Sequence, residues 1–528
     1  MTDCTESPPV AALLAPLLAA MLAGACAGGP RTATDPDVAS LDEAAATITA
    51  EDMFGRITAL AHDSMMGRDT PSPGLESAAR YIAGEFASFG LEPAGDGGTY
   101  LQRYPLPLRT LDTEGVHFGT VNGAGGENRM LRYGVDFFAA PAGEREGVDM
   151  FHGTFHWVGR VDEGGLPEFE YGPRTLIVTG IPGGFDRDWR TAVARARRAA
   201  QEIDASGLLV VLGPEFDAAM IERMAGVYGR PTRSLVEPRE IPVFFVTPAA
   251  WASILEREGL APGALPAAPG EPLVFENVRS HFQAMARVVE DAHPPNVVGL
   301  LRGSDPGLAN TYVVFSAHMD HVGVGAADGA GDSLYNGADD NASGTAALIE
   351  VAQAFAALEE PPARTLVFLA VSGEEKGLLG SRWYSDHPTV PLEGIVANVN
   401  VDMIGRNAPD SIVAIGIQYS SLGPLVERVA AENPGLGLTV VDDPWPEERF
   451  FFRSDHFNFA RKEIPALFFF AGVHADYHRP SDHAEKIDAD KAARVARLIF
   501  RTAHAVAESA EPPQWTPEGL AEVRALTR

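Results

Sequence analysis

Residues 312–320 read YVVFSAHMD, an apolar and β-branched run that ends at His318 and Asp320. Similar runs at residues 365–371 (TLVFLAV) and 396–401 (VANVNV) also lead directly towards acidic side chains. Runs of this composition predict strands, and largely apolar strands are typical of a parallel sheet that is buried on both faces. We predict an α/β fold with strands at residues 296–301, 312–317, 365–371, 396–401, 412–415 and 466–470, alternating with helices such as residues 348–358 and 495–506.

The polar side chains that follow these strands form a second pattern. In an open α/β sheet, ligands bind beyond the carboxyl ends of the strands. The sequence places there His318, Asp320, Glu374, Glu375, Asp402, Tyr477 and His478, with Asp340 at the start of the helix after His318. The chain has two cysteines, Cys4 and Cys26, both near the N-terminus. A metal site in the folded body must therefore use histidine and carboxylate ligands.

The pair His318 and Asp320 has a direct physical interpretation. A neutral imidazole can bind a metal while its other nitrogen donates a hydrogen bond, and a carboxylate two residues on can accept that bond. Residues 337–344, GADDNASG, place Asp340 in a tight turn of small residues before a helix. An acid there can act as a helix cap, or it can bridge two metal ions.

The adjacent residues Glu374 and Glu375 suit two different roles. Neighbouring side chains near a strand end point in different directions, so one can bind metal while the other stays free as a base. Asp402 directly follows a strand that is predicted to be buried, and a charge in that place needs a partner or a metal. His478 lies in a loop, where a polar side chain is ordinary on its own.

Five stretches together resemble a known family. SAHMDHVG, GADDNASG, SGEEKGLLGS, NVDMIGR and DYHRPSD are similar, in this order, to motifs of the di-zinc exopeptidases. That family includes bacterial secreted leucyl aminopeptidases, glutamate carboxypeptidase II, glutaminyl cyclases and the catalytically silent transferrin receptor. The resemblance covers residues 45–508. It implies a phosphorylase/hydrolase-like fold, in which a mostly parallel mixed sheet is sandwiched by helices.

The resemblance also implies a role for each polar side chain. His318 and Asp402 would bind one zinc ion, Glu375 and His478 would bind a second, Asp340 would bridge the two, Glu374 would be the general base, Tyr477 would stabilise the oxyanion, and Asp320 would orient His318. Manganese or cobalt could replace zinc, because all the donors are hard oxygens or borderline nitrogens. Two positions depart from the family: Arg479 stands where threonine is frequent, and His483 stands where an acid or threonine is common. These departures bear on substrate preference.

The implied function is that of a zinc-dependent aminopeptidase, which hydrolyses N-terminal residues from peptides. A carboxypeptidase on the same site is one alternative, and it would need a basic pocket, for which Arg406 and Arg453 are candidates. A glutaminyl cyclase is another alternative, although cyclases typically hold one zinc ion. A receptor-like binding protein that has lost catalysis should lack ligands or the base, and a solute-binding protein would not need the carboxylates at the strand ends.

Composition limits the partners. The chain has 72 acidic and 41 basic residues, a formal net charge of −31, which repels phosphate backbones. We therefore expect peptide substrates and no nucleic-acid partner, and the oligomeric state stays open. Residues 10–26, VAALLAPLLAAMLAGAC, are typical of an export signal. The ending AGAC resembles a bacterial lipoprotein cleavage site, so we expect an exported protein, periplasmic, secreted, or attached to the outer membrane by a lipid on Cys26.

Changes in composition along the chain predict its division into domains. Short β-like runs alternate with glycine and proline turns between residues 109 and 282, and that segment contains no close cluster of histidines and carboxylates. It resembles the protease-associated domain that several family members carry, and we expect it to be non-catalytic. We predict a signal peptide (1–26), a flexible tether (27–44), the first part of the catalytic domain (45–108), an inserted α+β domain (109–282), the main part of the catalytic domain (283–510) and a C-terminal tail (511–528).

Overall fold

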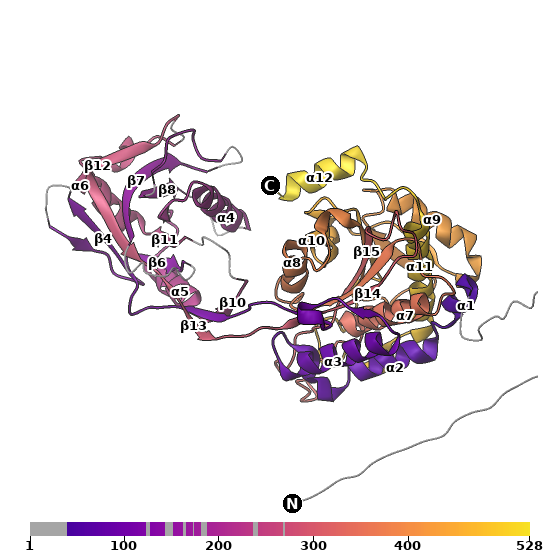
Figure 1. Ribbon diagram of the computed structural model, residues 1–528. Helices are drawn as coiled ribbons and strands as arrows, with labels where there is room; N and C mark the ends of the chain where they lie inside the picture. Colours follow the sequence, from indigo (N-terminus) through magenta and orange to yellow (C-terminus); the bar gives the residue numbers. More distant parts are fainter. Residues whose placement is uncertain are drawn as a thin grey trace, which may run out of the picture. The chain divides into compact units, whose positions relative to one another are not determined.

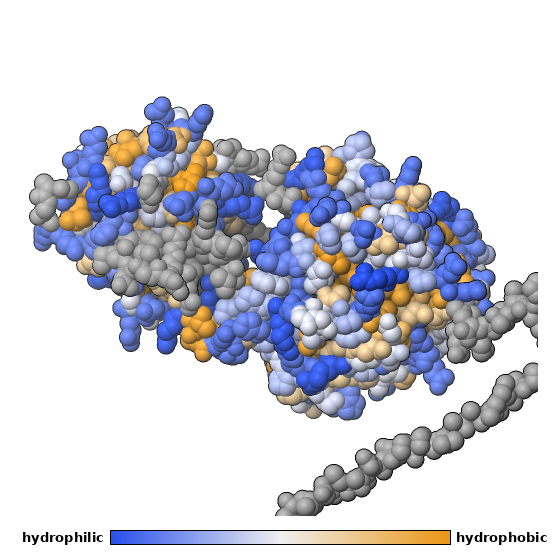
Figure 2. Space-filling model, viewed as in Figure 1, coloured by the Kyte–Doolittle hydropathy of each residue, from blue (hydrophilic) through white to orange (hydrophobic). Residues whose placement is uncertain are grey.

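The computed structural model describes residues 40–122, 127–142, 151–161, 165–172, 174–180, 187–235, 241–267 and 270–527. The expected signal peptide, Cys26 and most of the expected tether lie outside these residues and stay predictions. None of the helices in the described ranges combines the length and the apolar character that a membrane crossing requires. On the face shown in Figure 2, hydrophilic residues cover most of the surface, with smaller apolar areas between them.

The strands predicted around the polar residues form one nine-stranded mixed sheet. Its strands are β1 (Glu92–Pro93), β2 (Leu101–Arg103), β14 (Pro295–Leu301), β15 (Tyr312–His318), β16 (Thr365–Val371), β17 (Ile395–Val401), β18 (Ser411–Ile415), β19 (Thr439–Val441) and β20 (Ala466–Phe470). The order is β1-β14-β16-β15-β17-β20-β18-β19, and β2 also pairs with β14. The four central strands β16, β15, β17 and β20 are parallel, whereas β14 runs antiparallel to β16 and β18 runs antiparallel to β20. The predicted mostly parallel mixed sheet is confirmed.

Helices cover both faces of this sheet (Figure 1). One set contains α1 (Leu41–Ala46), α2 (Ala50–Leu60), α3 (Pro73–Ser88), α7 (Gly344–Ala356), α9 (Leu422–Glu432) and α11 (Ala489–Glu508), and the other contains α8 (Leu379–Asp386), α10 (His456–Ala460) and α12 (Pro517–Thr527). Alternate residues of β15 serve the two faces, as strand geometry requires. Phe315 packs in the core under α7 and α11, whereas Val314 packs with Tyr384 of α8 and Phe459 of α10.

Helix α3 shows how local sequence sets an element. Its N-cap, Ser72, accepts a hydrogen bond from the amide of Leu75, and Pro73 occupies the first helical turn. Leu75 and Phe86, at helical spacing, are both fully buried. Gly90 then adopts a φ of +78°, a left-handed conformation that ends the helix at low cost.

Residues 109–282 contribute to a second sheet, which has eight strands. These are β4 (His117–Asn122), β5 (Arg129–Met130), β6 (Phe137–Ala140), β7 (Phe151–Gly159), β8 (Thr175–Gly180), β9 (Gly207–Val211), β11 (Val243–Val246) and β12 (Leu273–Gln283). The order is β5-β4-β12-β7-β8-β9-β11-β6, accompanied by α4 (Arg187–Glu202), α5 (Ala218–Tyr228) and α6 (Pro248–Glu258). A third, three-stranded sheet joins β10 (Thr232–Arg233), β3 (Leu108–Leu111) and β13 (Ala286–Glu290). The likeness of this segment to a protease-associated domain stays a prediction.

Candidate metal centre

The predicted polar residues follow parallel strands that end side by side. Strands β15 and β17 are in register as far as the pair Ser316 and Asn400. His318 and Asp402 each stand two residues further along, so they lie level with one another. Asp340 lies in the turn that leads into α7, and the next residue in this turn, Asn341, donates a hydrogen bond of 3.0 Å to the oxygen of Val401 at the end of β17. The edge therefore gathers side chains that are far apart in the sequence.

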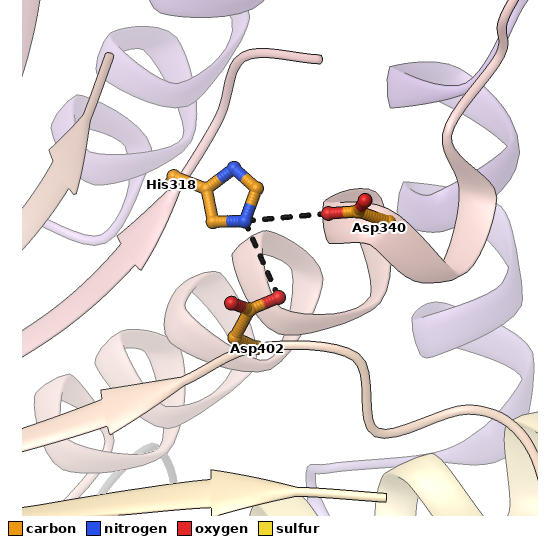
Figure 3. A group of neighbouring side chains, drawn as sticks. All are labelled: His318, Asp340 and Asp402. Carbon is orange, nitrogen blue, oxygen red and sulfur yellow. Dashed lines mark ion pairs between the residues drawn. The ribbon is translucent and has the colours of Figure 1, made fainter. Parts of the chain in front are cut away.

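His318, Asp340 and Asp402 form a first cluster of donor atoms (Figure 3). The Nε2 atom of His318 is 3.4 Å from Oδ1 of Asp340 and 3.2 Å from Oδ1 of Asp402. All three side chains are buried. His318 Nε2 and Asp402 Oδ1 have no hydrogen-bond partner, although the other Asp402 oxygen accepts a bond from Ser454 Oγ at 2.9 Å.

A second cluster lies on the other side of Asp340. His478 Nε2 is 3.1 Å from Oδ2 of Asp340 and 3.0 Å from Oε2 of Glu375. His321 Nδ1 is 2.8 Å from Oε1 of Glu375 and 3.6 Å from Oδ2 of Asp340. Asp340 therefore turns one carboxylate oxygen towards each cluster, the arrangement of a carboxylate that bridges two cations.

His321 received no role from the sequence. It is fully buried, it contacts Glu375, and its Nε2 atom has no hydrogen-bond partner. The signal was present in HMDH, where a second histidine follows His318 by three residues. A pattern of that kind does not say which histidine faces a metal, because the direction of each side chain after a strand end depends on the loop.

The donor atoms fit divalent cations. Tetrahedral ligands at about 2.0–2.1 Å from a zinc ion are about 3.3 Å apart. The separations within the clusters, from 3.0 to 3.4 Å for the pairs that involve His318 or His478, match that spacing. Burial disfavours a charged His318, yet the Asp402 and Glu374 carboxylates hold its pKa well above the ordinary value. The site thus favours positive charge at the point where the donors converge.

Glu374 is outside both clusters as far as the described residues show. It is half-buried. Burial and the nearby carboxylates of Asp455, Asp402 and Glu375 hold its pKa well above the ordinary value, against the opposing effect of His318. A carboxyl group with a raised pKa beside a cluster of metal-binding donors is suited to accept and return a proton.

Asp320 differs in detail from the expectation. The atom that lies at hydrogen-bond distance from Nδ1 of His318 is the backbone oxygen of Asp320, at 3.2 Å, whereas the Asp320 carboxylate is 3.7 Å away. That carboxylate accepts bonds from the Glu374 amide at 3.2 Å and from Thr70 Oγ1 at 3.1 Å. Asp320 thus holds the backbone of the Glu374 loop as well as lying beside His318.

Tyr477 stands at the rim of the second cluster. Its ring stacks on that of His478, with centroids 3.9 Å apart. Burial, together with the negative charges of Asp340 and Glu375, raises the pKa of Tyr477 far above its ordinary range. The hydroxyl therefore stays protonated at neutral pH and is available as a hydrogen-bond donor.

The two candidates for a carboxylate-binding cation are both engaged. Nη2 of Arg406 lies 2.9 Å from Oδ2 of Asp476. Nη1 of Arg453 lies 3.2 Å from Oε2 of Glu448, and its guanidinium covers the ring of Phe450 at 4.8 Å. Neither arginine offers the free charge that a carboxypeptidase pocket would need.

The geometry defines two adjoining clusters of histidine and carboxylate donors, which could hold metal ions, at the carboxyl edge of an α/β sheet. Residues 296–503 match the model of peptidase family M28. The matched range contains both donor clusters, Glu374 and Tyr477.

Several individual proteins are similar to this chain. Leupeptin-inactivating enzyme 1 of Streptomyces exfoliatus is 32% identical over 192 residues, which are 36% of this chain and 38% of that protein. Aminopeptidase YwaD of Bacillus subtilis is 29% identical over 191 residues, 34% of this chain and 39% of that one. The chain thus spans about two fifths of the length of these relatives. Among solved structures, an aminopeptidase from Aneurinibacillus sp. strain AM-1 aligns with a TM-score of 0.46 and 18% identity, covering 90% of this chain and 97% of that one.

Proposed function

We propose that the protein is a metal-dependent aminopeptidase that holds two zinc ions and removes N-terminal residues from peptides. The observation that carries the proposal is the position of Asp340, whose two oxygens face two separate donor clusters. His318 and Asp402 complete one cluster, and Glu375 and His478 complete the other. The names of the relatives, an aminopeptidase and a leupeptin-inactivating enzyme among them, support the same activity.

The residues around the clusters have separable tasks in hydrolysis. Bound zinc would supply Lewis-acid chemistry, polarising a carbonyl and acidifying water. Glu374 would accept a proton from the attacking water at its carboxylate and deliver that proton to the leaving amine. Tyr477 would donate its hydroxyl hydrogen to the oxygen on which negative charge develops. Asp320 would keep Glu374 in place through the bond to its amide.

The charge of the site favours a substrate with a free amine. Asp340, Asp402, Glu374 and Glu375 surround the point where the clusters meet. Two divalent cations would offset much of this charge, and Glu374 stays outside the donor clusters. An ammonium group has carboxylates to approach here, whereas Arg406 and Arg453 are already paired. The carboxylates gathered at the donor clusters therefore favour an aminopeptidase over a carboxypeptidase.

The decisive experiment combines a metal count with a substrate panel. Purified protein should hold about two zinc ions per chain. It should hydrolyse aminoacyl reporter substrates and peptides with free amines, and it should not hydrolyse the same peptides after N-acetylation. Activity should disappear on treatment with a strong chelator and return on addition of zinc. Equal hydrolysis of blocked and free peptides, or full activity after verified metal removal, would refute the proposal.

We also propose export and a separate inserted domain. The apolar residues 10–26 support export, with lipid attachment at Cys26. The eight-stranded sheet supports the domain, because its strands lie between His117 and Gln283. Metabolic labelling with a fatty acid, compared between the native chain and Cys26→Ser, tests the lipid: label in both proteins or in neither would contradict it.

A further inference from the structure

A pocket adjoins the second donor cluster. It has a volume of about 510 Å³, which lies in the range of small-ligand sites. Tyr477, His478 and Arg479 line one side, and Ala326 and Tyr335, from the loop after β15, line another. The Tyr335 hydroxyl donates a hydrogen bond to the Ala326 oxygen at 3.1 Å, which holds that loop together. Because His478 belongs to both the pocket and the donor cluster, the pocket begins where the reacting bond would lie.

The Arg479 side chain, which lines this pocket, carries a positive charge that is not paired by any described residue. Within the described part of the chain, its guanidinium forms no ion pair and no hydrogen bond. The carboxylate in the same loop, Asp476, is already occupied by Arg406 at 2.9 Å, Lys486 at 2.7 Å and Ser481 Oγ at 2.6 Å. Arg479 is exposed, so an incoming ligand can reach it.

Two other polar side chains of the pocket, those of Asp328 and Ser481, form hydrogen bonds within their own loops. Asp328 Oδ1 accepts hydrogen bonds from the amides of Ala330 at 2.8 Å and Asp332 at 3.0 Å, which closes its own turn. The Ser481 hydroxyl donates to Asp476. Arg479 is therefore the lining cation that has no partner among the described residues, whereas the Asp328 carboxylate keeps its charge but is bonded within its own turn.

Electrostatics orients a peptide in such a site. The ammonium group of a substrate is drawn to the carboxylates around Glu374, and Arg479 repels it. A carboxylate is drawn in the opposite direction, towards Arg479, where a guanidinium can bind it with two parallel hydrogen bonds. The part of the substrate that carries the carboxylate therefore lies on the leaving side of the scissile bond.

We propose that Arg479 is a specificity-determining residue that binds a carboxylate on the leaving side of the substrate. This inference rests on the proposed aminopeptidase function and narrows its substrate class. The carboxylate can be the C-terminus of a dipeptide or the side chain of an acidic residue that follows the scissile bond. In both cases the preferred substrates are short or acidic peptides.

The test compares matched substrates on one metal-loaded enzyme. Leu-Ala is compared with Leu-Ala-amide to measure selectivity for a terminal carboxylate, and Leu-Glu-amide is compared with Leu-Gln-amide to measure selectivity for an acidic side chain. A charge-assisted contact predicts a kcat/KM ratio of roughly ten to a hundred in at least one pair. Which pair shows that ratio identifies the source of the carboxylate.

Variants then test whether Arg479 causes the difference in kcat/KM between the matched substrates. In Arg479→Gln the ratio should fall to about one, and Arg479→Lys should keep an intermediate value, because a lysine retains the charge but not the fork of donors. The matched control is Arg428→Gln on α9, a surface arginine with 62% side-chain exposure, which should retain the native ratio. Ratios near one in both pairs for the native enzyme, or a ratio unchanged in Arg479→Gln, would overturn the inference. Failure to hydrolyse any of the four substrates would instead refute the aminopeptidase activity itself.

Discussion

Nε of Arg68 donates a hydrogen bond of 2.8 Å to the backbone oxygen of Met319, the residue between His318 and Asp320. The same guanidinium donates to the oxygen of Gly337 at 2.8 Å, in the turn that carries Asp340. Arg68 is 1% exposed. Burial lowers its pKa to about 10, so it stays charged at neutral pH. One buried cation thus connects the two backbone segments that carry His318 and Asp340.

We expect Arg68→Lys and Arg68→Met to weaken metal binding. Two further bonds, to the oxygens of Leu60 at 2.6 Å and Asn336 at 2.7 Å, complete a set of four that a lysine ammonium cannot reproduce. Loss of residues that orient metal ligands typically lowers affinity about 10- to 100-fold. Titration against a competing chelator measures this, with Arg80→Met as the control on the exposed side of α3. Equal affinity in folded Arg68→Lys would show that the ligand segments hold their positions without it.

Glu374→Gln should separate metal binding from catalysis. Because Glu374 lies outside the two donor clusters, the variant should retain both zinc ions. Loss of a general base should reduce turnover by at least about 10²-fold. Metal content and kcat are measured on the same preparation, with Glu360→Gln, an exposed site beyond α7, as the control. Near-normal kcat in Glu374→Gln would remove Glu374 from the role of base.

The positions of secondary-structure elements could be predicted where the amino-acid composition of a segment alone determines its structure. The runs at 365–371 and 466–470 coincide with β16 and β20, because strands that are buried on both faces of a parallel sheet are largely apolar throughout. The predicted helix 348–358 was less accurate at its start, since α7 begins at Gly344. The first turn of α7, residues 344–347, reads GTAA. These small residues show no apolar periodicity, so the sequence pattern could not indicate that the helix begins there.

The contacts that support the site were beyond sequence reasoning. Arg68 reads as a surface arginine in MMGRD, and its role depends on carbonyl oxygens some 250 residues away. Asp320 was expected to receive a bond from His318, but its carboxylate is occupied by Thr70 and by the Glu374 amide. Residue type predicts which side chains can bind a metal. The hydrogen-bond partners of the carboxylate oxygen or imidazole nitrogen that does not face the cluster depend on how distant loops pack, and the sequence does not give that packing.

His321→Gln should weaken the second cluster selectively. The His321 ring holds Oε1 of Glu375 at 2.8 Å, and its loss would leave Glu375 free to rotate away from His478. We expect a two-step metal titration in which one step shifts by about tenfold or more and the other does not, in line with other residues that orient ligands. His293→Gln, at a half-exposed histidine, is the control. A parallel shift of both steps would mean that His321 supports the whole centre.

The last prediction concerns stability and pH. Glu350 of α7 is completely buried and pairs with Arg56 of α2. Burial raises its pKa to about 7, above the ordinary value of 4.5. Between about pH 4.5 and 7 the folded protein therefore binds more protons than the unfolded chain, so the free energy of unfolding should fall as pH rises through this window. One pKa unit corresponds to about 1.4 kcal/mol, so the loss due to Glu350 is at most about 3 kcal/mol.

Glu350→Gln should remove the part of this pH-dependent loss of stability that is due to Glu350. The amide oxygen of glutamine can still accept a hydrogen bond from Arg56, but the side chain does not titrate. Urea unfolding of the metal-loaded proteins at pH 5 and pH 8 measures the effect. The native protein should lose more stability between these two values than Glu350→Gln does, and other titrating groups cancel in the difference between the two proteins. Glu360→Gln, at an exposed site, should follow the native protein. If Glu350→Gln and the native protein lost the same free energy over this range, the proton on Glu350 would have no share in the stability of the fold.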